Sequence, residues 1–203
     1  MGLKRNIRNF LAVSAVALMG GAYASEAPDV EVKNVTEEVL AVMARTSDTK
    51  TLGDLAETKV VPHFDFRRMT QLAAGRVWNQ ASPQQQERLA TEFQHLLVRT
   101  YTRALASSQH AKANVAVQPV RLGAGSEEAV VRTTVSEPGR KAIAVNYRME
   151  RQGDDWKVVD VMVENISLVT NYREWFAGQA QNGGVEAVIQ ALVEKNKAAG
   201  KVG

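Results

Sequence analysis

The chain contains no cysteine, and only three of its 203 residues are histidines. Without thiols there is no disulfide to stabilise an exported fold, no thiolate nucleophile and no cysteine ligand for a metal ion. We also expect no lipoprotein anchor, because such a lipid is attached to a cysteine at the cleavage site. Aromatic residues make up only 6% of the chain. The apolar surface is therefore built mainly from slim side chains such as valine, leucine and methionine.

Long apolar runs are also lacking. The apolar run at 10–19 is too short to span a bilayer, which needs about 20 residues. It follows a basic stretch within residues 1–8 and precedes Ala22-Tyr23-Ala24, a small-x-small cleavage signature. This pattern predicts a cleavable signal peptide over 1–24 and one mature domain over 25–203. We therefore expect the mature protein in the periplasm.

The predicted mature chain lacks an excess of positive or negative charge. The full sequence has 25 Lys+Arg and 22 Asp+Glu, but three of the basic residues and none of the acidic ones lie in residues 1–24. Removing those three leaves 22 basic residues against 22 acidic ones. Nucleic-acid binding needs clustered Lys and Arg. We therefore expect no nucleic-acid partner, although composition leaves a local basic patch open.

Apolar residues recur at helical spacing through the first half of the chain. They predict a helix over 32–43, a short helix from Leu52, and a helix that Asp65 caps and Gly75 ends. The clearest start signal is the run 82–85, Ser-Pro-Gln-Gln, which combines an N-cap hydroxyl, a first-turn proline and a glutamine at the capping-box position. The long helix behind it carries one apolar stripe: Leu89, Phe93, Leu96, Leu97, Thr100, Tyr101, Ala104 and Leu105.

The middle of the chain alternates apolar and polar residues with the period of a strand. Strands are predicted around 115–117, 131–135, 143–149 and 156–163, with a hairpin turn at 152–155. The last strand is apolar on both faces, which indicates that both faces are covered. We place Val159, Val161 and Val163 on one of its faces, and Trp156, Val158 and Met162 on the other.

The tail returns to helix. Ser167 is the expected cap of one helix, and a break at 183–184 precedes a final amphipathic helix over 185–193. The fold class is therefore α+β, with an antiparallel sheet of about four strands packed against several helices.

Catalytic signatures are scarce. The sequence has no Gly-x-Ser-x-Gly, phosphate-binding loop, dinucleotide fingerprint or His-Glu-x-x-His. His63 and Asp65 are close enough to share a metal, but two ligands within one turn favour surface or capping roles. Asp160 lies inside an apolar strand, where pairing with an Arg or Lys is the simpler explanation and a general acid or base is the alternative. We expect no metal and no cofactor.

Two blocks of the sequence carry a resemblance to a known protein family. They span residues 64–105, beginning with Phe64-Asp65-Phe66, and residues 156–195, beginning with Trp156-Lys157-Val158. Within them, the matching positions are Met69, Gly75, Trp78, Ser82-Pro83-x-Gln85, Phe93-x-x-Leu96-Leu97-x-x-Thr100-Tyr101, Asp160-Val161, Glu164, Ser167-Leu168-Val169, Tyr172-Arg173, Phe176, Gly184 and Leu192. The chain resembles MlaC, the periplasmic phospholipid carrier of the Mla (maintenance of lipid asymmetry) system, also known as the toluene-tolerance auxiliary family.

The sequence departs from the family at Asn165, where the family usually has glycine. Asparagine tolerates a left-handed backbone, so we expect the turn to survive.

The resemblance implies a fold related to nuclear-transport-factor-2-like domains, with an apolar pocket between a sheet and its helices. Phospholipid would be the bound cargo, with its acyl tails inside and its headgroup near solvent. The implied partners are an inner-membrane ABC transporter with a substrate-binding-type hexamer and an outer-membrane lipoprotein–porin complex. The protein is expected to be a monomer and not an enzyme.

The expected pocket lining combines one face of two strands with parts of two helices. Its members are Phe93, Leu97, Tyr101, Ile143, Val145, Tyr147, Met149, Val159, Val161, Val163, Leu168, Tyr172 and Phe176. Periodicity alone does not distinguish a filled interior from a hollow one, and the opposite strand faces are the alternative lining.

Two other classes of function stay open. One is a small-molecule isomerase or hydratase on a cone-shaped α+β scaffold, which would need a carboxylate or histidine inside the cavity, with Asp160 as the candidate. The other is a periplasmic chaperone or adaptor with an exposed apolar groove.

Overall fold

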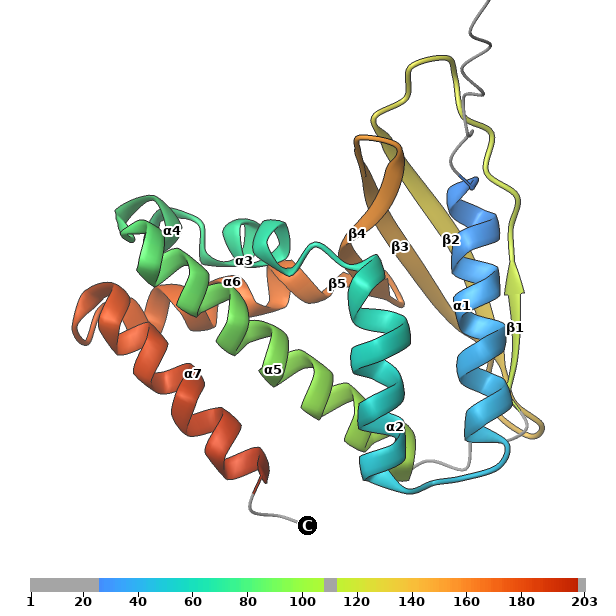
Figure 1. The fold of residues 1–203 in the computed structure, drawn as a ribbon, viewed down its shortest axis with the longest axis horizontal. Coiled ribbons are helices and arrows are strands. Elements are labelled where there is room, and N and C mark those ends of the chain that lie inside the picture. The colour runs from blue at the N-terminus through green and yellow to red at the C-terminus, as the bar shows by residue number, and fades with distance from the viewer. Residues whose placement is uncertain (1–25, 108–112, 201–203) are drawn as a thin grey trace, which may run out of the picture.

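The computed structural model describes residues 26–107 and 113–200. A sheet with α1 against one face forms one half of the structure, and α3 to α7 form the other (Figure 1). The elements in chain order are α1 (Pro28–Met43), α2 (Thr49–Leu55), a π-helical turn (Ala56–Val60), a 3₁₀ turn (Val61–His63), α3 (Phe66–Ala74), α4 (Arg76–Gln80), α5 (Pro83–Ser107), β1 (Asn114–Val117), β2 (Glu128–Ser136), β3 (Ile143–Gln152), β4 (Asp155–Val163), β5 (Ile166–Ser167), α6 (Leu168–Ala180) and α7 (Gly184–Gly200). The predicted signal peptide lies outside the described residues.

The predicted helix caps are confirmed. Asp65 accepts a hydrogen bond from the Arg68 backbone N–H at 2.8 Å, and α3 ends before Gly75, whose φ of +53° favours glycine. At the start of α5, the Gln85 N–H donates to Ser82 Oγ at 3.3 Å and the Ser82 N–H donates to Gln85 Oε1 at 3.0 Å. This is the reciprocal capping box that the sequence predicts.

The sheet contains five antiparallel strands in the order β1-β2-β3-β4-β5 among the described residues. The predicted 152–155 turn joins β3 to β4, with Gly153 at a φ of +61°. The fifth strand is the two-residue β5, which pairs with the end of β4 through a turn at Glu164 and Asn165. Asn165 has a φ of +67°, so the left-handed turn survives without glycine as expected.

A β-bulge in β4 changes the predicted faces of that strand. Tyr147 lies opposite Val161 and Arg148 opposite Asp160, but Met149 lies opposite Val158, so Val159 is the extra residue. A one-residue shift reverses the side on which every following side chain lies. Val158 therefore shares a face with Val161 and Val163, and the prediction that Val159 shares that face is wrong.

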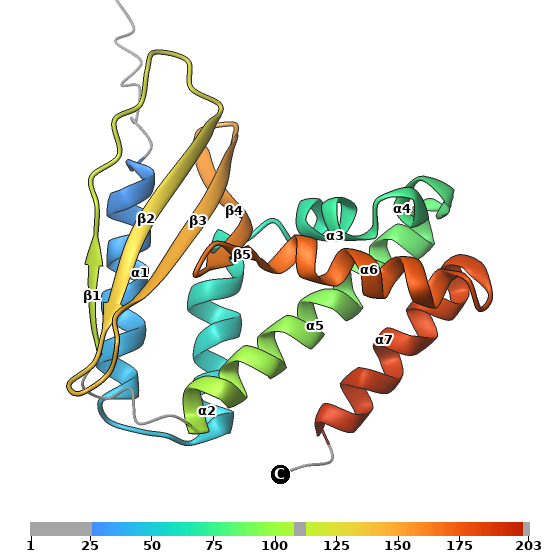
Figure 2. The same ribbon diagram turned by 180° about the vertical axis from the view of Figure 1, so that it is seen from behind.

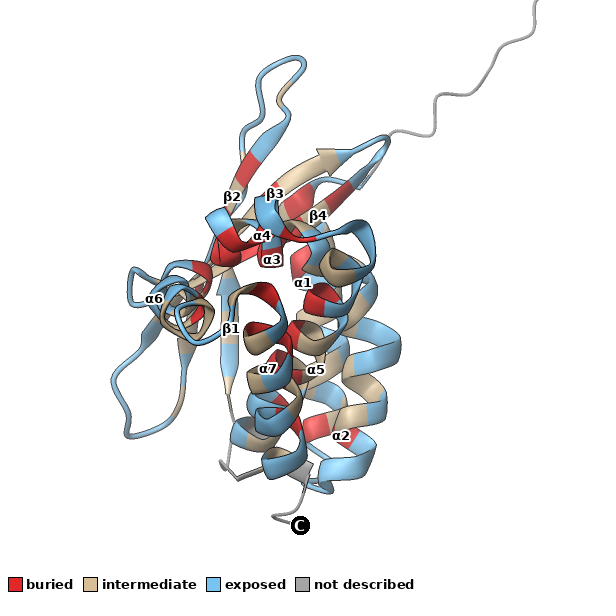
Figure 3. Ribbon diagram, turned by 90° about the vertical axis from the view of Figure 1, so that its left-hand side faces the viewer, coloured by how far each residue is buried: buried red, intermediate tan, exposed pale blue. Residues whose placement is uncertain are grey.

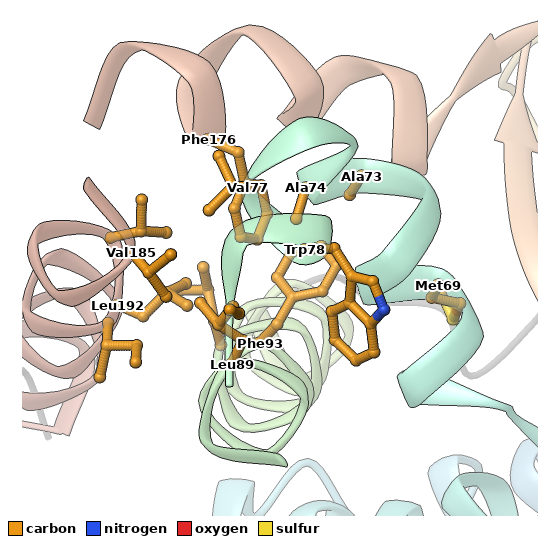
Figure 4. Packing of buried hydrophobic residues seen from close by; sticks show 14 of the residues in the cluster. Met69, Ala73, Ala74, Val77, Trp78, Leu89, Phe93, Phe176, Val185 and Leu192 are labelled. Carbon is orange, nitrogen blue, oxygen red and sulfur yellow. The ribbon is translucent and has the colours of Figure 1, made fainter. Parts of the chain in front are cut away.

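Each half of the described structure has a hydrophobic cluster of its own. In the helical half, Leu89 and Phe93 of α5 pack against Phe176 of α6 and Leu192 of α7 (Figure 4). The buried residues of α5 and α7 lie where these helices face each other (Figure 3). The second cluster joins Val32 of α1 to the sheet, where Val131, Met149, Trp156 and Val158 are buried. In the part of the chain that the structure describes, no helix has the length and apolar character to cross a membrane.

Candidate functional site

A cavity of about 390 Å³ lies between the sheet and the helices that cover it. Viewed from behind, the sheet lies in front of α1, with α2 and the end of α5 beside it (Figure 2). The sheet contributes Val115, Val135, Tyr147, Met149, Val158, Val161 and Val163 to the lining. The facing helices and turns contribute mainly aliphatic residues, among them Val32, Val35, Val39, Leu40, Met43, Leu52, Leu55, Val60, Leu97 and Val98. The cavity is thus built to hold apolar material.

One end of the cavity opens to solvent. Tyr101 at the end of α5 and Val163 at the end of β4 line the cavity and are 43% and 41% exposed, respectively. Ile166 of the adjacent β5 is 67% exposed. Lining residues near the opposite end, such as Met149 and Val158, are buried. We call the end at Tyr101 and Val163 the mouth.

Few polar side chains line the cavity. Glu31 of α1 and His63 of the 3₁₀ turn contact each other, with 2.5 Å between Oε1 and Nδ1. Two threonines and two tyrosines complete the polar groups: Thr36, Thr102, Tyr101 and Tyr147. Burial raises the pKa of both Tyr101 and Tyr147, because a phenolate is costly in apolar surroundings. Both hydroxyls are therefore held in the neutral form.

Asp160 lies outside the lining. Its carboxylate accepts a hydrogen bond from Ser167 Oγ at 2.6 Å and another from the Val169 N–H at 3.1 Å. Ser167 in turn caps α6 by accepting from the Thr170 N–H at 3.0 Å. The expected pairing with an Arg or Lys is wrong, since within the part of the chain that the structure describes Asp160 is bonded to the start of α6 and not to a cation. The same bonds explain why a charge is tolerated in this buried strand.

His63 and Asp65 have separate tasks. His63 contacts Glu31, whereas Asp65 caps α3. Among the described residues, no group of three or more His, Asp or Glu side chains is placed to hold a metal ion.

The cavity lies within a region that matches a known family. Residues 33–194 match the family model described as MlaC protein. The chain belongs to the MlaC family. The family match includes α2 to α6, the whole sheet and most of α1 and α7, and it confirms the resemblance drawn from the sequence.

Two proteins similar to this chain illustrate the relationship. The toluene tolerance protein ttg2D of Pseudomonas putida is 28% identical over 104 residues, which are 51% of this chain and 47% of that protein. The match therefore spans about half the length of this curated relative. A phospholipid-binding protein from Ralstonia solanacearum, solved in complex with a phospholipid, is 35% identical and has a TM-score of 0.76. That likeness covers 85% of this chain and 98% of the other.

The structure places part of the expected MlaC pocket lining along the cavity. The residues found there are Leu97, Tyr101, Tyr147, Met149, Val161, Val163 and Leu168. Their side chains come from α5, β3, β4 and the start of α6, so one face of the sheet and one end of α5 converge as expected. That these residues contact lipid stays a prediction.

Three expected lining residues lie in the helical core instead. Phe93 is fully buried, with its ring 5.0 Å from that of Tyr172 and 5.3 Å from that of Phe176. The physical reason is the length of α5, 25 residues. Its first half packs among α3, α6 and α7, and only its second half reaches the cavity.

Three expected strand residues also lie outside the lining. The bulge removes Val159 from the cavity face. Ile143 stands at the start of β3 and is 43% exposed. Val145 lies opposite Val163, so it shares the cavity face, but it is not part of the cavity wall.

The wall formed by α1 and α2 was absent from the expected lining. Val35, Val39 and Met43 of α1 and Leu52 of α2 border the cavity. The signal for them was present, since these residues recur at helical spacing. The pattern predicted an apolar face without showing that a hollow lies against it.

Proposed function

We propose that this protein carries phospholipid, holding acyl tails in the cavity and the headgroup at the mouth. The observation that carries the proposal is an almost wholly apolar cavity with one open end. The bound phospholipid named for the Ralstonia solanacearum protein supports the choice of ligand. The volume of about 390 Å³ lies within the range of roughly 300–1,000 Å³ that is common for ligand pockets.

Free energy explains why such a carrier is needed. Two acyl tails hold about 32 methylenes, and exposing each to water costs about 0.8 kcal/mol, or roughly 25 kcal/mol in all. Free lipid therefore leaves a membrane too rarely to cross an aqueous compartment at a useful rate. A carrier must cover the tails without binding them so strongly that they never leave. Valine, leucine and methionine suit this task because apolar burial is non-directional and discriminates little between tails.

The proposed setting is the periplasm, between an outer-membrane lipoprotein–porin complex and an inner-membrane ABC transporter with a substrate-binding-type hexamer. Membership of the MlaC family and the predicted signal peptide over 1–24 support this setting. The chain would exchange phospholipid with both complexes, and their energetics would set the net direction.

A non-enzymatic role accords with the family and with the position of Asp160. That carboxylate, the candidate acid or base, is bound to Ser167 and Val169 outside the cavity. The enzyme alternative now depends on Glu31 and His63, which do line the cavity. Because they bond to each other across α1 and the 3₁₀ turn, we assign them to joining these elements.

Lipid transfer between vesicles tests the proposal. Donor vesicles would carry a self-quenched fluorescent phospholipid, and acceptor vesicles none. We expect the protein to accelerate dequenching in proportion to its concentration, and to hold lipid after separation from vesicles. Unchanged transfer together with an empty protein would refute the carrier function.

A further inference from the structure

Tyr147 is one of the polar side chains that line the cavity and have no hydrogen-bond partner among the described residues. Tyr147 lies on β3, opposite Val161 and two residues from Val145, which is paired with Val163 at the mouth. At about 3.3 Å per residue, Tyr147 stands roughly 7 Å inward from the mouth along the strand. Met149 and Val158 line the cavity farther from the mouth than Tyr147 does.

The Tyr147 hydroxyl is neither bonded nor sealed off. No described group lies within hydrogen-bonding geometry of it. The side-chain polar atoms that are fully occluded and unpartnered, within the described residues, belong to Asp29 and Asn196. The Tyr147 Oη therefore keeps some accessible surface, and it belongs to a side chain that lines the cavity.

An unpaired donor in apolar surroundings costs free energy unless a ligand supplies an acceptor. Burial that raises the pKa of Tyr147 keeps the group a neutral O–H donor. The methylene chains of the tails have no acceptor for this hydrogen bond. In a glycerophospholipid the ester groups lie between the headgroup and the tails, so with the headgroup at the mouth they enter the cavity next.

We propose that the Tyr147 hydroxyl donates a hydrogen bond to an acyl ester carbonyl of the bound lipid. The inference rests on the proposed carrier function and deepens it. It makes the site selective for ester-linked over ether-linked lipids, because an ether lacks the carbonyl acceptor. It also fixes the depth to which the lipid enters, independently of headgroup and tail length.

Paired lipids and paired variants test this inference. The lipids are a diester and a diether phosphatidylglycerol with identical saturated tails, and binding is measured by competition against a fluorescent lipid. The wild type should favour the diester by about two- to ten-fold, the range expected for one net hydrogen bond. Tyr147→Phe keeps the ring and should lose most of that preference. Tyr172→Phe removes a hydroxyl outside the lining and should keep it.

Infrared spectroscopy measures the frequency of the ester carbonyl band, which would not change if Tyr147 had only a structural role. With carbon-13 at the ester carbonyls, bound lipid in the wild type should show a carbonyl band shifted to lower frequency by hydrogen bonding. Tyr147→Phe should return that band to higher frequency. Equal ester and ether binding by the wild type, or an unchanged preference and band in Tyr147→Phe, would overturn the inference while leaving the carrier function intact. If neither lipid binds to any of the proteins, the carrier function itself is wrong.

Discussion

At the scale of single residues, the structure distinguishes apolar side chains that fill the core from those that line the cavity. Val161 and Phe93 are both apolar and both lie on predicted apolar faces, yet one borders the cavity and the other is in the helical core. Polar residues are divided in the same way. The Asp160 carboxylate accepts two hydrogen bonds at the start of α6, whereas the Tyr147 hydroxyl has no partner among the described residues. Each difference leads to a measurable effect.

Filling the cavity should block lipid without unfolding the protein. In Val161→Trp the added indole would occupy space beside Tyr147, so we expect lipid occupancy to fall several-fold with little loss of stability. Val130→Trp is the matched control, because Val130 lies on the opposite face of the sheet, across from Arg148. Phosphate analysis of extracted protein measures occupancy. Equal occupancy in Val161→Trp and wild type would mean that lipid binds elsewhere.

Removing the Asp160 carboxylate should destabilise the fold. Asp160→Ala leaves the Ser167 hydroxyl and the Val169 N–H without their acceptor, at a cost of about 1–3 kcal/mol in the free energy of unfolding. Urea unfolding checks this value. Asp155→Ala, whose side chain is 74% exposed, should change stability by less than about 0.5 kcal/mol. If Asp160→Ala were as stable as wild type, the bonds to α6 would not explain the buried charge.

Alkaline pH should weaken the lipid-free fold. Burial raises the pKa of Tyr101, Tyr147 and Tyr172 above the ordinary value of 10.0, so the unfolded chain loses these protons first. The stabilisation is complete below pH 10 and is lost as the pH rises toward the folded-state values. Tyr147→Phe should show a smaller fall in unfolding free energy above pH 10. An identical pH profile would mean that Tyr147 is solvated in the folded protein.

At the scale of elements, local signals in the sequence predict most boundaries. Ser82 and Gln85 form the predicted capping box, and Asp65 and Ser167 cap the predicted helices. The β4 bulge was missed because the run 156–163 is apolar on both faces, and such a strand shows no break in pattern where its register shifts. Nor did α1 reveal its role, since residues that line a cavity and residues that fill a core have the same helical period.

The helical core should be separable from lipid binding. Ile189 of α7 is fully buried against α5 and α6, away from the cavity lining. Ile189→Ala should lower the free energy of unfolding by about 2–5 kcal/mol while lipid occupancy of the folded protein is unchanged. Gln190→Ala, on the exposed side of α7, serves as the control. Loss of lipid from a folded Ile189→Ala protein would show that the two halves are coupled.

At the scale of the whole molecule, the helical half formed by α3 to α7 adjoins a half in which the sheet walls the cavity. The helical half has a filled core, and some residues of that core, among them Met69 and Leu97, also line the cavity. Net neutrality of the predicted mature chain gives no general attraction to anionic membranes, which suits a carrier that must also leave them. The family and the apolar cavity together make lipid carriage the central claim.

Native mass spectrometry of the protein, purified from a bacterial host without detergent, tests that claim most directly. We expect a mass above that of the polypeptide by one or two phospholipids, and organic extraction should recover those lipids after denaturation. The Val161→Trp protein should show a smaller bound fraction, and Val130→Trp the wild-type fraction. A bare polypeptide mass, unchanged after incubation with phospholipid vesicles, would contradict the account and direct attention to Glu31 and His63 as an enzymatic pair.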